Sequence, residues 1–103
     1  MAVSRLYIQR EELKHLVDTS GLDEGRKQRL RGLIPHMLPS ELLRLKLSLL
    51  SMLEIEAAQE TIDSIIKTRK EPENEETLWA NVHETFMKKV EWVEERTKRA
   101  MGE

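Results

Sequence analysis

The leucine-rich segment 42–53 constrains the fold of this chain more than any other feature. Eight of its twelve residues are apolar, and Lys46 stands among the leucines. Successive residues of a helix are rotated by about 100°, so these apolar side chains spread over more than half of the circumference. A helix that is apolar over so much of its surface must be covered by several others. The segment therefore predicts the central helix of a small helical bundle.

Composition favours an all-α protein of one domain, 1–103. The chain has 103 residues, 39% of them hydrophobic and 4% aromatic. That length is sufficient for a core, and the scarcity of aromatic residues argues against β-sheets. The absence of cysteine excludes disulfides and fits a reducing compartment. The longest apolar stretch is too short and too charged for a membrane span, so we expect a cytoplasmic protein without a membrane partner.

Capping and helix-breaking residues divide the chain into about four helices. Ser4, Asp23 and Asn74 are typical N-cap residues, and Pro39 suits the first turn of a helix. The expected helices span residues 4–18, 23–34, 39–70 and 74–101. Because only the short linker 71–73 separates the last two, they should form an antiparallel hairpin.

The expected hairpin is too long for a compact domain. Its helices would span about 48 and 42 Å at 1.5 Å per residue. A compact chain of this size has a diameter of roughly 34 Å. Either the helix 39–70 breaks, near residues 54–60, or the hairpin projects from the rest of the molecule. The regular pattern of the last helix favours the second arrangement.

That last helix carries a coiled-coil-like seam of seven mostly apolar residues, spaced at alternating intervals of four and three. The seam consists of Trp79, His83, Phe86, Val90, Val93, Thr97 and Ala100. The facing wall is expected from Ala57, Ala58, Thr61, Ile62, Ile65 and Ile66. Two helices alone rarely bury enough surface to be stable. The sequence allows two completions: the helix 4–18 folds back to give a monomeric bundle, or a second chain covers the hairpin.

Six cations form a basic patch that offers an alternative function. They are Arg26, Lys27, Arg29, Arg31, Arg44 and Lys46. Such a patch can bind the phosphate backbone of a nucleic acid. However, the following helix is leucine-rich, where a DNA-reading helix would be polar, and no aromatic stacking platform accompanies the patch. The same cations could instead be solvated, or dock on the acidic segment 71–76.

Catalytic and metal-binding motifs are incomplete. Lys46 could be a buried amine of lowered pKa, but a lysine among leucines more often reaches solvent or pairs with a carboxylate. Glu12 and His15 have the spacing of a di-iron motif, but the second copy that such a site requires is missing. His83 and Glu84 begin a zinc-protease motif that has Met87 in place of the second histidine. We therefore predict no catalytic, cofactor-binding or metal site and no small-molecule substrate.

These observations predict a non-enzymatic helical module for protein–protein interaction or assembly, which associates with a second copy or with another protein. Residues 1–52 carry nine Lys/Arg and six Asp/Glu, whereas residues 53–103 carry eight and thirteen. This asymmetry favours attraction between the halves of one chain or between two chains. The expected interface residues are Trp79, His83, Phe86, Val90, Trp92 and Val93. Binding to a nucleic-acid backbone is the alternative function.

Overall fold

The computed structural model describes residues 5–102 of the chain, and all regular elements in this range are helical. The helices are α1 (Arg5–Thr19), α2 (Glu24–Leu33), the 3-10 helix η1 (Ile34–His36), α3 (Pro39–Thr68) and α4 (Glu75–Ala100). The prediction of a small all-α bundle of four helices is confirmed. The expected cap Ser4 lies outside the described residues.

Local capping accounts for where the helices begin and end. The Asp23 carboxylate accepts a hydrogen bond from the Arg26 N–H at 2.9 Å, and the Asn74 amide oxygen accepts one from the Thr77 N–H at 2.8 Å. These bonds satisfy N–H groups that the first turn of a helix leaves unpaired. Arg69 has a left-handed backbone, with φ of 56°. It therefore ends α3 two residues earlier than predicted.

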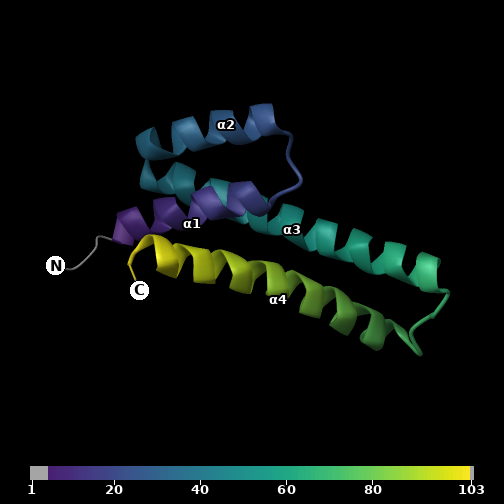
Figure 1. The fold of residues 1–103 in the computed structure, drawn as a ribbon. Helices are drawn as coiled ribbons and strands as arrows, with labels where there is room; N and C mark the ends of the chain where they lie inside the picture. Colours follow the sequence, from purple (N-terminus) through teal and green to yellow (C-terminus); the bar gives the residue numbers. More distant parts are fainter. Residues whose placement is uncertain (1–4, 103) are drawn as a thin grey trace.

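Helix α3 is continuous and the hairpin projects (Figure 1). Its 30 residues extend over about 45 Å. Helix α1 packs against both α3 and α4 where these two helices diverge, and α2 packs on α1 at the same end. The other half of the hairpin extends beyond α1 as two helices. The molecule measures 50 × 30 × 21 Å, with a radius of gyration of 15.9 Å, compared with about 13 Å for a compact chain of 100 residues.

The core lies at the end of the molecule where α1 joins the hairpin. Its buried residues are Leu13, Leu16, Val17, Ile34, Leu42, Leu49, Leu53 and Val93. The leucine-rich segment thus supplies much of the core, as predicted. However, Leu43 and Leu47 are 53% and 59% exposed, because α2 packs on α1 and η1 and leaves one side of α3 uncovered. None of the described helices is long and apolar enough to cross a membrane.

Candidate interaction surface

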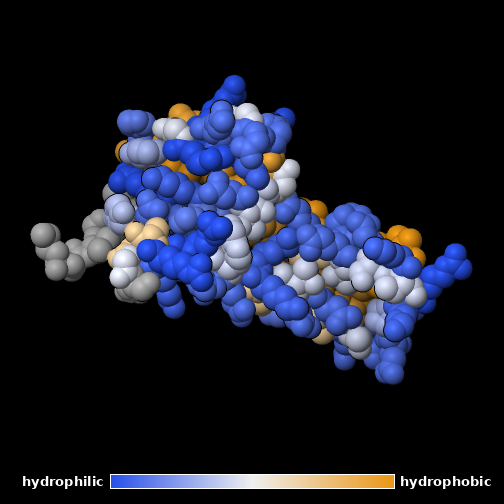
Figure 2. Space-filling view, in the orientation of Figure 1, coloured by the Kyte–Doolittle hydropathy of each residue, from blue (hydrophilic) through white to orange (hydrophobic). Residues whose placement is uncertain are grey.

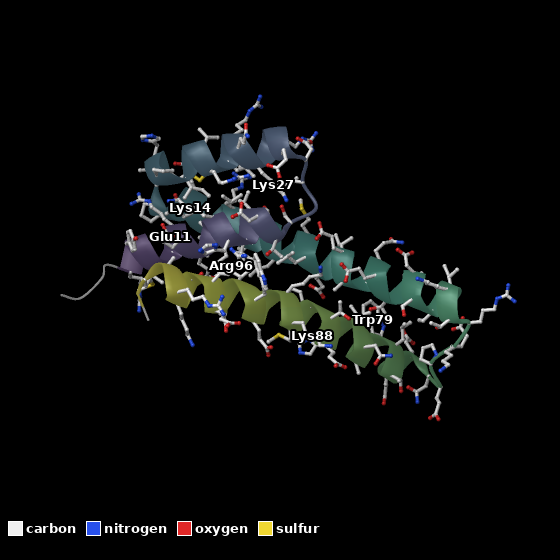
Figure 3. All side chains as sticks on the ribbon, in the orientation of Figure 1. Glu11, Lys14, Lys27, Trp79, Lys88 and Arg96 are labelled. Atoms are coloured by element: carbon white, nitrogen blue, oxygen red, sulfur yellow. The ribbon has the colours of Figure 1, made fainter. Side chains whose placement is uncertain are left out.

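An apolar face lies on the part of the hairpin that α1 does not reach. Ser51, Ile55 and Ala58 of α3 border a hollow with Trp79 of α4. A second hollow, lined by Val82, His83 and Phe86, adjoins it and shares Trp79 and Glu54 with it. We call this continuous surface the hairpin face. Trp79, which is labelled in Figure 3, shows where the α4 side of this face lies, beyond the end of α1.

Two large side chains of the hairpin face are exposed. Ile55 is 69% exposed and Trp79 is 55% exposed. On the outer side of α3, Leu47, Ile62 and Ile66 extend this exposure toward both ends of the helix. Hydrophobic side chains appear between hydrophilic ones along this edge in Figure 2. Single exposed apolar residues are ordinary, whereas a group of neighbouring ones is a feature of association surfaces in general, and this makes the hairpin face the candidate interaction surface.

Some residues of the predicted seam of α4 are buried in the structure, and others are exposed. Val93 is 2% exposed and Phe86 packs against the core, whereas His83 is exposed. Nearer the linker, Val82 is buried in place of Trp79. The expectation of one continuous seam is wrong, because α4 packs on α3 alone near the linker and also on α1 farther along. A spacing of 3.5 residues would keep one partner in register throughout.

The predicted interface residues therefore have different surroundings. Val93 is covered within the chain, so we leave it out of the proposed interface, and Val90 is half-buried. Trp79, His83 and Phe86 lie together on the hairpin face. Trp92 does not join them: its ring lies 4.4 Å from the Arg96 guanidinium and borders a different hollow.

The wall predicted on α3 is divided in a similar way. Ala57 and Thr61 are buried, whereas Ile62 and Ile66 are exposed. The sequence pattern placed these residues on one surface against α4 and did not indicate Ile55 as a site residue. The spacing of Ile55, Ile62 and Ile66 could have indicated Ile55, because intervals of seven and four residues place side chains on one side of a helix.

The opposite side of the hairpin is polar. Lys89 of α4 pairs with Glu60 of α3 at 2.8 Å. Ser64, Thr85 and Lys88 surround the neighbouring hollow. The two sides of the projecting hairpin therefore differ in chemistry, and the hairpin face is the more apolar of the two.

Lys46 forms an ion pair with Glu12 of α1. Its Nζ lies 2.9 Å from Oε1 of Glu12, and the two side chains are 33% and 27% exposed. The expectation that Lys46 meets a carboxylate of another helix is confirmed. Glu12 is thereby directed toward Lys46, while His15 lies beside Glu11 at 4.0 Å. Within residues 5–102, no three acidic, histidine or cysteine side chains are arranged to hold a metal ion.

Most of the predicted basic patch is engaged inside the chain. Arg31 pairs with Asp18 at 3.3 Å and with Glu24 at 3.4 Å, and Arg26 pairs with Asp23 at 3.5 Å. Lys27 donates a hydrogen bond to the Asp18 carbonyl at 3.0 Å, reaching from α2 toward α1 (Figure 3).

Among residues 5–102, Arg29 and Arg44 are the two cations of the patch with neither an ion pair nor a side-chain hydrogen bond. The patch does not dock on segment 71–76 of the same chain, because α2 and this linker lie at opposite ends (Figure 1). The carboxylates that pair with Arg26 and Arg31 lie within the patch. They weaken the positive electrostatic potential that binding to a nucleic-acid backbone would require.

Comparisons of the chain with models of protein families, with curated proteins and with solved structures found no match.

Proposed function

We propose that this protein is a non-enzymatic helical assembly module, which associates through the hairpin face with a second copy of itself. The observation that carries the proposal is the exposed apolar surface around Ile55 and Trp79, on a hairpin that projects beyond its supporting helix. The cysteine-free composition supports a reducing compartment, and we place the module in the cytoplasm.

The amount of exposed surface supports this proposal. The chain exposes 7631 Å², whereas a compact monomer of 12.1 kDa exposes roughly 6,000 Å². A typical stable interface buries about 800 Å² on each partner. The elongated shape of the molecule accounts for this excess, and the projecting hairpin contributes to it (Figure 1). Tryptophan is also enriched among the residues that dominate binding energy, which fits the position of Trp79.

Sedimentation equilibrium over a wide range of protein concentration tests this function. We expect the wild-type chain to form dimers and Ile55→Glu to remain monomeric, because the new carboxylate would be desolvated in the interface. Ser64→Glu is the matched control: it adds the same charge nine residues along α3, on the polar side, and should not affect dimerisation. A wild-type chain that remains monomeric at high micromolar concentration would contradict the proposal.

A further inference from the structure

Six apolar or small side chains of α3, five of them exposed and Ala58 half-buried, are arranged symmetrically about the middle of the helix. Leu43 and Ile66, Leu47 and Ile62, and Ser51 and Ala58 each lie at equal distances from a midpoint between Glu54 and Ile55. The four large residues of this set are among the exposed hydrophobic side chains of the chain. These three pairs read the same from both ends of the helix, and at the midpoint itself Ile55 stands opposite Glu54.

Such a pattern is what a two-fold interface requires. In a two-fold dimer the same patch is used by both subunits, so residue i meets residue j and j meets i. We propose that α3 pairs antiparallel with α3 of a second copy, about a two-fold axis beside Ile55. This inference rests on the proposed function and gives it a register: Leu47 lies against Ile62 of the second copy, and Ser51 against Ala58 of the second copy.

The spacing of these residues also sets the angle at which the helices cross. Leu43, Leu47, Ser51 and Ile55 follow one another at intervals of four, as do Ala58, Ile62 and Ile66. Rows with this interval pack into one another at a crossing angle near −50°, with helix axes about 8–10 Å apart. Ser51 and Ala58, the smallest side chains of the set, lie close to the crossing point, where the axes approach most closely.

Charged residues of α3 that lie beside the six symmetric residues fit the same arrangement. Among residues 5–102, the Arg44 guanidinium has no ion pair, and the Asp63 carboxylate accepts a hydrogen bond only from Gln59 of its own helix, at 3.4 Å. In the antiparallel register, Arg44 and Asp63 of the second copy lie on the same edge of the helix pair, outside the region of closest approach. They therefore attract each other at longer range, and two-fold symmetry makes this attraction occur twice. Charged pairs at the rim of an interface contribute mainly to specificity and register.

Trp79 borders the axis from α4. It shares its hollow with Ser51, Ile55 and Ala58, the residues at the crossing point. The second copy would therefore cover the indole as well as α3. Glu54 lies in the same hollow and close to its symmetry mate, and this repulsion limits affinity. We expect Glu54→Gln to tighten the dimer roughly two- to fivefold, the effect of one exposed charge pair.

Chemical cross-linking tests the register directly, because the chain contains no cysteine and each introduced thiol is unique. We expect a short bis-maleimide to couple Ile55→Cys to itself. Leu47→Cys and Ile62→Cys should each fail to couple alone, because the two identical positions lie about 22 Å apart along antiparallel helices. A mixture of these two variants should couple efficiently. Ser64→Cys, on the polar side, is the control and should not couple.

The outcomes separate this inference from the proposed function. Coupling of the Ile62→Cys variant to itself would overturn the antiparallel register and leave the assembly role standing. A dimer in sedimentation without coupling of Ile55→Cys would have the same meaning. A monomer at every concentration would overturn both proposals. Because all four substituted positions are exposed, the variants should fold, and circular dichroism of each variant verifies this.

Discussion

The Nζ of Lys46 lies 2.9 Å from Oε1 of Glu12, and this contact joins the leucine-rich part of α3 to α1. The ion pair explains how a cation is accommodated among leucines. Burial of one partner without the other would be costly, whereas a paired and partly hydrated lysine is tolerated. The pair also fixes α1 against α3 at the end of the molecule opposite the hairpin tip.

We expect this ion pair to contribute little to stability. A double-mutant cycle with Glu12→Gln and Lys46→Met should give a coupling free energy of about 0.5 kcal/mol, because both side chains are hydrated. Lys46→Met alone should not lower the free energy of unfolding by more than about 1 kcal/mol. Urea unfolding measures these values. A coupling free energy of several kcal/mol would contradict this prediction, because it would mean that the ion pair is shielded from water.

Two leucines of α3 should differ strongly in their contribution to stability. Leu53→Ala should lower the free energy of unfolding by about 2–5 kcal/mol, because Leu53 is fully buried. Leu47→Ala makes the same chemical change at an exposed position and should cost less than about 0.5 kcal/mol. Thermal or urea unfolding of dilute, monomeric protein makes the comparison. Equal losses would contradict the assignment of the two sides of α3.

Tryptophan fluorescence should report assembly at one ring and not at the other. In Trp92→Phe, emission comes from Trp79 alone, and we expect it to shift to shorter wavelength as protein concentration rises and the indole leaves water. In Trp79→Phe, emission comes from Trp92, which lies against Arg96 away from the hairpin face. That emission should not change. A shift at Trp92 instead would place the interface on the polar side of the hairpin.

Nucleic-acid binding should be weak. Fluorescence anisotropy of a labelled duplex at about 50 mM salt favours detection, because binding driven by phosphate contacts is strongest at low salt. We expect little binding, since Arg26 and Arg31 are already paired with carboxylates. Strong binding that is lost in the double variant Arg29→Glu and Arg44→Glu would instead support the alternative function, because these cations have no ion pair within residues 5–102.

The beginnings of the helices could be predicted from sequence, because each depends on a few neighbouring residues. Asp23 and Asn74 accept hydrogen bonds from N–H groups three residues away, and Pro39 occupies the first turn of α3. Helix length left two alternatives, a break near residues 54–60 or a projecting hairpin, and the continuous α3 of the structure corresponds to the second. The candidate site was predicted only in part, because Trp79, His83 and Phe86 were anticipated and Ile55 was not.

The all-α class, the four helices and the antiparallel order of the last two therefore follow from local sequence signals. Which sides of α3 and α4 are covered depends on how the helices pack together. Caps and helical periodicity act over one or two turns, whereas burial depends on where α1 packs, through contacts between residues far apart in the chain. Because α1 ends partway along the hairpin, it buries Val93 and leaves Ile55 and Trp79 exposed.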